Sequence, residues 1–117
     1  MHKYKNLNVW NEGRKLVKDI YILTTKFPAD ERFGLTSQMR RAAVSIISNI
    51  AEGAGRRTNG EYRQFLGIAN GSAFEVEAQC VVSCDLGFLD EKTLAVIGDR
   101  VDHISRMIVK LQDSLTK

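Results

Sequence analysis

The chain contains 117 residues with a formal net charge of +3 at pH 7, and 44% of the residues are hydrophobic while 26% are charged. This length and composition are typical of a globular protein with its own core, and they exclude a disordered polar chain. The apolar runs are too short to cross a bilayer, and the basic N-terminus lacks the apolar segment of a signal peptide. We therefore expect one cytoplasmic domain over residues 1–117, with no membrane partner.

Two amphipathic helices are predicted for the first half of the chain, because apolar residues recur at steps of three and four. The first helix should stop near Pro28, the single proline of the sequence. After a link from Ala29 to Leu35, Thr36 is the expected cap of the second helix, and Gly53 and Gly55 should end it. The apolar stripes are Val9, Gly13, Leu16, Ile20, Leu23 and Phe27 in the first helix, and Met39, Ala43, Ile46 and Ile50 in the second.

Two further helices are predicted for the second half. Thr58 and Glu61 have the spacing of a capping box, so the third helix should begin there and run toward Gly87. Asp90 is the expected cap of the fourth helix, with Glu91 in its first turn. The stripes are Tyr62, Phe65, Leu66, Ala69, Ala73, Val76 and Cys80, and then Leu94, Ile97, Val101, Ile104, Ile108, Leu111 and Leu115. Because short links favour antiparallel neighbours, the expected fold is all-α, an up-down-up-down four-helix bundle.

Several short motifs resemble those of a known family. In chain order they are LNVW at Leu7–Trp10, Phe27-Pro28, FGLTSQMRRAA at Phe33–Ala43, SNIAEGAGR at Ser48–Arg56 and FLGIANGS at Phe65–Ser72. Their order and spacing resemble the four-helix-bundle family of ribosomal RNA intervening-sequence proteins. One position departs from the family pattern, because Ile47 stands where a proline is expected. A proline would bend the second helix, and without it that kink is not carried over.

The resemblance brings expectations about function. Members of this family are encoded within insertions in large-subunit ribosomal RNA genes, and they have no established enzyme activity. Their fold is similar to that of a pentameric accessory protein of diversity-generating retroelements, which binds nucleic acid. The resemblance therefore implies a homo-oligomer, with a pentamer as the expected form, and RNA or DNA as a partner.

The basic charge is concentrated in the first part of the chain. Residues 1–69 hold 12 lysines and arginines against 6 acidic residues, whereas residues 70–117 hold 5 against 8. Guanidinium groups pair with phosphate oxygens, and such contacts position a nucleic acid without reading its sequence. The hypothesis is one phosphate-facing patch formed by Arg40, Arg41, Arg56, Arg57 and Arg63. The alternative is a solvated surface with local ion pairs, such as Glu52 with Arg56 four residues later.

A stripe of polar residues lies along one side of the predicted second helix and consists of Ser45, Ser48, Asn49 and Glu52. If it faces a neighbouring subunit, its hydrogen bonds would fix the register of a head-to-tail ring. The alternative is the solvent-facing side of an ordinary amphipathic helix. The larger aromatic residues are interpreted as core or interface filler in preference to base-stacking platforms, and they are Tyr4, Trp10, Tyr21 and Phe88.

No combination of residues predicts a catalytic or metal site. The histidines are His2 and His103, and a di-iron site in a bundle would need Glu-x-x-His motifs that the sequence lacks. Cys80 and Cys84 lie four apart on one helical face, which suits buried free thiols better than a disulfide or a zinc site. We therefore expect no enzyme activity and no cofactor.

Together these features predict a non-catalytic oligomeric bundle that binds nucleic acid, RNA in particular, through its arginine-rich half. The alternative is a protein-interaction module whose oligomer recruits a partner protein, with the arginines serving solubility.

Overall fold

The regular structure of the protein consists of helices joined by short links. The computed structural model describes residues 3–116, and no strand occurs in that range. Two single-turn 3-10 helices precede the first two α-helices: η1 spans Tyr4–Asn6 and η2 spans Ala29–Glu31. The α-helices are α1 at Asn8–Thr24, α2 at Leu35–Ala54, α3 at Asn59–Asp85 and α4 at Glu91–Ser114.

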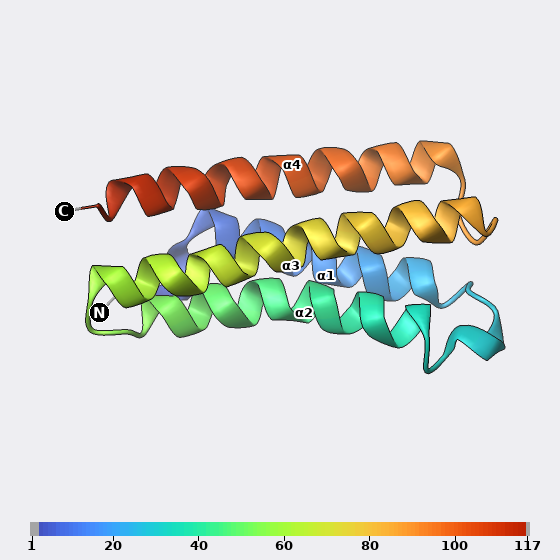
Figure 1. The fold of residues 1–117 in the computed structure, drawn as a ribbon, viewed down its shortest axis with the longest axis horizontal. Helices are drawn as coiled ribbons and strands as arrows, with labels where there is room; N and C mark the ends of the chain where they lie inside the picture. The colour runs from blue at the N-terminus through green and yellow to red at the C-terminus, as the bar shows by residue number, and fades with distance from the viewer. Residues whose placement is uncertain (1–2, 117) are drawn as a thin grey trace.

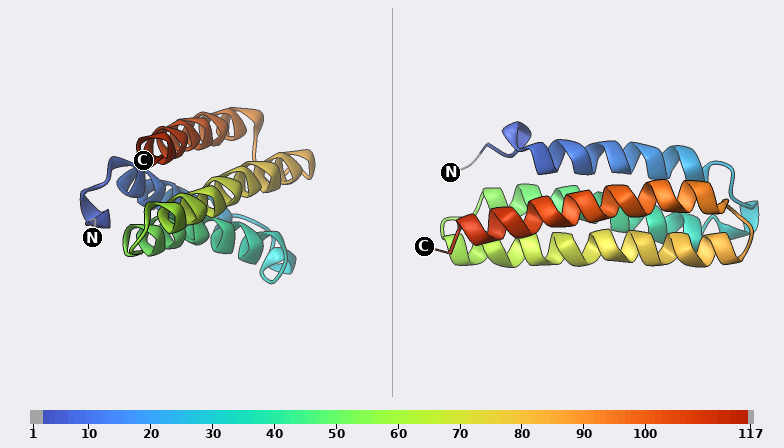
Figure 2. Two further views of the ribbon diagram at one scale, coloured as in Figure 1. Left: turned by 60° about the vertical axis from the view of Figure 1, so that its left-hand side comes forward. Right: turned by 90° about the horizontal axis from the view of Figure 1, so that it is seen from above.

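Successive α-helices run in opposite directions along an elongated body of 46 × 24 × 20 Å (Figure 1). Both ends of the chain lie at the end of the bundle that also carries the link between α2 and α3. Each helix packs against its neighbour in the chain, most extensively α2 against α3, and α1 also contacts α4 to close the bundle (Figure 2). The predicted all-α, antiparallel four-helix bundle is confirmed. None of the helices in the described part of the chain combines the length and apolar character needed to cross a membrane.

The predicted apolar stripes meet in one core. All four helices contribute side chains without solvent exposure, among them Leu16, Ile46, Leu66 and Ile108. The stripes continue past the helix ends, because Phe27 is buried beyond α1 and its ring lies 5.5 Å from that of Phe88. Burial of these apolar surfaces is the main stabilising contribution in a protein of this size.

Three helix ends follow the local signals in the sequence. The Thr58 hydroxyl accepts a hydrogen bond of 3.1 Å from the Glu61 amide, which confirms the predicted start of α3. Asp90 caps α4 by accepting from the Thr93 amide at 2.8 Å, and hydrogen bonds from the side chain and backbone of Thr93 lower the pKa of Asp90. Gly87 ends α3 in the left-handed conformation, with a φ of 80°.

The predicted cap of α2 at Thr36 was wrong, and of the two glycines expected to end the helix only Gly55 does so. The helix begins at Leu35, whose amide donates to the Glu31 carboxylate at 3.1 Å, so the expected cap Thr36 is buried inside the helix. Gly53 is also buried inside α2, which ends at Ala54 with Gly55 as its cap. The reason is tertiary, because α3 crosses so closely that a Cβ on Gly53 would lie 2.9 Å from the Cβ of Phe65.

Isoleucine in place of the family proline keeps α2 continuous. The helix runs without interruption through Ile47, because this residue retains the backbone N–H that proline lacks. Its side chain occupies space that α1 leaves open at Gly13, where an added Cβ would lie 2.8 Å from Ile47 Cγ2. Gly13 and Ile47 therefore let α1 and α2 approach each other closely.

Candidate nucleic-acid interface

The five arginines of the predicted patch fall into two groups at opposite ends of α2. Arg40 and Arg41 lie in its second turn, whereas Arg56 and Arg57 follow its last residue and Arg63 lies near the start of α3. At a rise of about 1.5 Å per residue, the 15 residues from Arg41 to Arg56 separate the two groups by roughly 22 Å. The expectation of one patch was therefore wrong, because a continuous helix holds its two ends apart.

Arg40 ties the end of α1 to α2. Its Nε donates to the Thr24 hydroxyl at 2.8 Å, and its Nη2 donates to the Tyr21 carbonyl oxygen at 3.3 Å. The guanidinium also lies over the Tyr21 ring, 4.6 Å from the centroid. Arg40 thus has a structural role that the sequence does not reveal, and its second terminal nitrogen is still able to contact a ligand.

The second group is divided between two sides of the bundle. Arg56 forms the expected ion pair with Glu52 at 2.9 Å and lies over the Phe65 ring. Arg57 and Arg63 are exposed, and neither forms an ion pair within residues 3–116. Arg63 lies beside α4, because Gln112 donates to its carbonyl oxygen at 3.0 Å. For Arg56, the alternative of a solvated surface with local ion pairs therefore holds.

A cation and aromatic surface that the sequence analysis missed runs along α1. Trp10, Arg14 and Tyr21 share one side of the helix, since their spacings of four and seven correspond to whole turns. The Arg14 guanidinium lies 5.2 Å from the Trp10 ring centroid, and Tyr4 packs edge-on against Trp10 at 5.0 Å. The interpretation of the aromatic residues as core filler holds for Tyr4 and Trp10, which pack against the core. Tyr21, in contrast, is 42% exposed.

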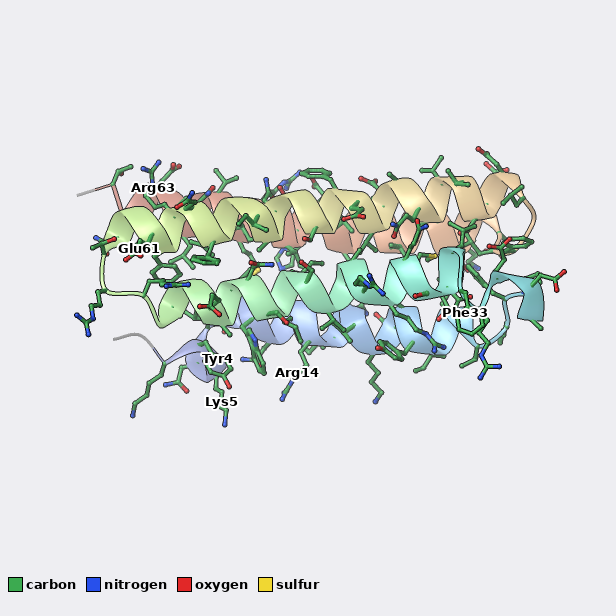
Figure 3. The ribbon with its side chains drawn as sticks, turned by 60° about the horizontal axis from the view of Figure 1, so that its bottom comes forward. Tyr4, Lys5, Arg14, Phe33, Glu61 and Arg63 are labelled. Carbon is green, nitrogen blue, oxygen red and sulfur yellow. The ribbon has the colours of Figure 1, made fainter. Side chains whose placement is uncertain are left out.

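This surface continues across α2, and we call it the α1–α2 face. Figure 3 shows Lys5 and Arg14 projecting from the α1 side and Phe33 just before α2, while Arg63 lies on the far side, on α3. The acidic side chains of α1 are engaged elsewhere: Asp19 pairs with Arg100 of α4 at 2.9 Å, and Glu12 pairs with Lys15 at 3.2 Å. The α1–α2 face is defined by Tyr4, Lys5, Trp10 and Arg14 of η1 and α1, together with Tyr21, Arg32, Phe33, Arg40 and Arg41, which line a common hollow.

A hollow of about 510 Å³ lies at the end of the α1–α2 face where η2 leads into α2. Its walls carry the side chains of Tyr21, Arg32, Phe33, Arg40 and Arg41, and no acidic residue lines it. Three guanidinium groups around one hollow create a strongly positive local field, which favours an anion. We call this the Phe33 hollow.

The polar stripe of α2 serves contacts within the chain at two of its four positions. The Ser45 hydroxyl is hydrogen-bonded to the Ser72 hydroxyl of α3 at 2.9 Å, and the Asn49 amide donates to the Ser45 carbonyl oxygen at 2.8 Å. Ser45 thus links α2 to α3, Asn49 is hydrogen-bonded within α2, and Ser48 and Glu52 are exposed.

An apolar surface on α3 is the clearest feature that periodicity did not predict. This helix is apolar on its outer side as well as on its core side, which we call the α3 face. Its exposed members are 43–49% accessible, and they are Ile68, Phe74, Val81 and Val82 of α3 together with Val109 of α4. Gly71 lies among them with nothing within 4 Å of the position a Cβ would take. Exposed apolar patches of this kind are typical of association surfaces.

The histidines and cysteines are the remaining candidates for metal binding or nucleophilic chemistry. No group of three histidine, cysteine or acidic residues in the described part of the chain could hold a metal ion. His103 is exposed, and His2 lies outside the described residues. Cys80 is buried and Cys84 is half-buried, and both are free thiols, as expected.

Neither thiol is expected to react with iodoacetamide in the folded protein. Burial, reinforced by Glu77, raises the pKa of Cys80 to about 12, so roughly one Cys80 thiol in ten thousand is ionised at pH 8. Desolvation, followed by the nearby Glu91, Asp85 and Asp90, raises the pKa of Cys84 as well. Mass spectrometry after alkylation should show two modifications only when the protein is unfolded in guanidinium. Rapid modification of the native protein would instead reveal an activated nucleophile.

The fold and the α1–α2 face define the class of protein, which is an all-α four-helix bundle with one cationic and aromatic face. The family model of the 23S rRNA-intervening sequence protein matches residues 5–110. The chain therefore belongs to this family, and the resemblance seen in the sequence motifs is confirmed. A comparison with curated proteins finds no match.

Proposed function

We propose that this protein is a non-catalytic, self-associating bundle that binds RNA through the α1–α2 face in the cytoplasm. The observation that carries the proposal is the row of arginines interleaved with aromatic rings, with Arg14 over Trp10, Arg40 over Tyr21 and Arg32 over Phe33. Such surfaces suit a nucleic acid, because guanidinium groups pair with phosphates and rings stack on bases. The family name, which refers to 23S rRNA, makes RNA the first ligand to test.

In the proposed complex, the protein contacts the phosphate backbone of the RNA more than its bases, so binding depends little on base sequence. The cations on the α1–α2 face are Lys5, Arg14, Arg32, Arg40 and Arg41, and their contacts to phosphates would release counterions. For a single-stranded RNA with five neutralised phosphates, the slope of log K against log salt is about −3.5 per protomer. Raising the salt from about 50 to about 200 mM should therefore weaken binding by roughly 100-fold.

Self-association through the α3 face would place several RNA-binding surfaces on one particle. A second copy of the chain is the proposed occupant, because Phe74, Val81 and Val82 offer apolar surface that water otherwise covers. The family resemblance makes a pentamer the proposed form, and the avidity of several linked surfaces would strengthen binding. The rival function is recruitment of a partner protein by this same α3 face.

Replacing two α1–α2 cations by neutral side chains tests the proposed RNA site. The Arg14→Gln, Arg41→Gln double variant is expected to weaken binding of a short single-stranded, fluorescein-labelled RNA by at least about tenfold and to reduce the salt slope by about 1.4. Neither residue forms an ion pair within the described part of the chain, so the fold should be unaffected. Fluorescence anisotropy across a salt series measures both quantities.

The matched control removes the same charge from another side of the bundle. Arg106→Gln with Lys110→Gln changes exposed residues of α4 and should leave RNA affinity within about twofold of the unmodified protein at equal salt. A separate Arg57→Gln, Arg63→Gln variant reports whether the second arginine group contributes. Equal losses in all three variants would mean that net charge, not a defined face, controls binding. Absence of RNA binding by an intact oligomer would favour the partner-recruitment function.

A further inference from the structure

Phe33 is an aromatic residue whose position the fold does not explain. It lies between η2 and α2, at the rim of the Phe33 hollow, and it is 88% exposed. A single exposed ring is common on protein surfaces, but this one lies beside a hollow lined by Arg32, Arg40 and Arg41, which makes it available to a ligand that carries both a ring and a negative charge. The ring is not isolated, because the Arg32 guanidinium lies 5.6 Å from its centroid.

The hollow beside this ring combines an apolar surface with fixed positive charge. Tyr21 also lines this hollow, and two hydrogen bonds hold the Arg40 guanidinium over the Tyr21 ring. Because Arg40 is already immobilised, it would lose little conformational freedom on binding an anion. Ser37 also lines the hollow, and its hydroxyl can donate or accept a hydrogen bond.

Phe33, Ser37 and Arg41 also line a second hollow. The second hollow also has a volume of about 510 Å³, and it is lined by Phe33 and Arg41 together with Gln38, Ser45 and Glu75. The one acidic side chain of the pair, Glu75, lies in this second hollow and not in the Phe33 hollow. Phe33 and Arg41 are thus shared by the two hollows, and they offer a stacking ring and a phosphate ligand to adjacent nucleotides.

We propose that the Phe33 hollow holds an unpaired nucleotide of single-stranded RNA, with its base against Phe33 and its phosphate among Arg32, Arg40 and Arg41. This inference rests on the proposed RNA binding and adds a preference for single strands. A duplex keeps its bases stacked inside the helix, so it can contact the cations but cannot offer a base to the ring. Single-stranded or looped RNA can offer both.

The test compares three RNA ligands of equal length: a single strand, a blunt duplex, and a single strand with abasic residues at its centre. We expect the unmodified protein to bind the single strand more tightly than the other two. Phe33→Leu should weaken binding of the single strand by about five- to tenfold, because one base loses its stacking partner, and should leave duplex binding unchanged. Fluorescence anisotropy at fixed salt gives the affinities.

The control is Val96→Ala, which removes apolar atoms at a position of α4 that is 51% exposed and belongs neither to the α1–α2 face nor to the α3 face. This variant should bind all three ligands as the unmodified protein does. Equal, salt-dependent binding of single strand and duplex, unaffected by Phe33→Leu, would overturn the single-strand site while leaving the proposed RNA binding intact. No binding of any of the three ligands would overturn both. Thermal unfolding confirms that Phe33→Leu, at an exposed position, still folds.

Discussion

Two glutamates on the α3 face, in the Phe74→Glu, Val81→Glu variant, are expected to dissociate the proposed oligomer into protomers of 13.1 kDa. The two positions are seven residues apart and lie on the same side of the helix. Both side chains are more than 40% exposed in the protomer, so the bundle itself should tolerate the change. Between subunits, each new carboxylate would be buried without a partner, which costs several kcal/mol per charge.

Sedimentation velocity measures the mass, and circular dichroism shows whether the helices remain. The control is Ile22→Glu with Val96→Glu, which introduces the same charges into the exposed apolar groove between α1 and α4. This control should keep the oligomeric mass of the unmodified protein. Dissociation by the control alone would move the interface to the α1–α4 groove, and a monomeric unmodified protein would refute self-association altogether.

Gly53→Val is expected to reduce the free energy of unfolding by about 3 kcal/mol, the upper end of the usual range for overpacking. A Cβ at this position would lie 2.9 Å from the Cβ of Phe65, 3.0 Å from Cδ1 of Tyr62 and 3.2 Å from the Tyr62 carbonyl oxygen. Two of these atoms are fixed to the backbone of α3, so the helices must move apart. The α2–α3 pair forms the largest helix contact, which makes this shift costly.

Chemical denaturation gives the change in unfolding free energy, and the midpoint of thermal unfolding should fall by about 10 °C or more. Gly55→Val is the control, because it makes the same change two residues later. At Gly55 the nearest atoms to an added Cβ are 3.6 Å away and φ is −86°, so a side chain fits without strain. A similar loss of stability in both variants would mean that valine itself, and not the α2–α3 approach, is responsible.

Local signals predicted the features whose cause lies within a few residues. Thr58 and Asp90 cap their helices because the amides they accept from are three residues away in the chain. Gly87 ends α3 because the left-handed turn is accessible to glycine without steric cost. The same holds for the apolar stripes, since a helix of 3.6 residues per turn places every third or fourth side chain on one face.

The candidate site depends on contacts between helices, and these contacts cannot be read from the sequence. Arg40 and Arg41 are adjacent in the chain, yet Arg40 is bound to the end of α1 while Arg41 lines two hollows. Arg14 and Phe33 received no role in the sequence analysis, although the spacing of Trp10 and Arg14 was a readable signal. Which of these residues share a face follows from the way α1 packs on α2.

The sequence by itself therefore determined the number of helices, most of their ends, the core residues and the family. Each of these depends on short-range geometry or on a pattern repeated along one helix. Only the tertiary structure decided that Arg40 is bound to the end of α1, that Gly53 is a contact point between helices, and that α3 has an apolar outer side. The physical reason is that a surface is made of residues from different helices, whose relative placement is set by packing between them and not by the periodicity within any one of them.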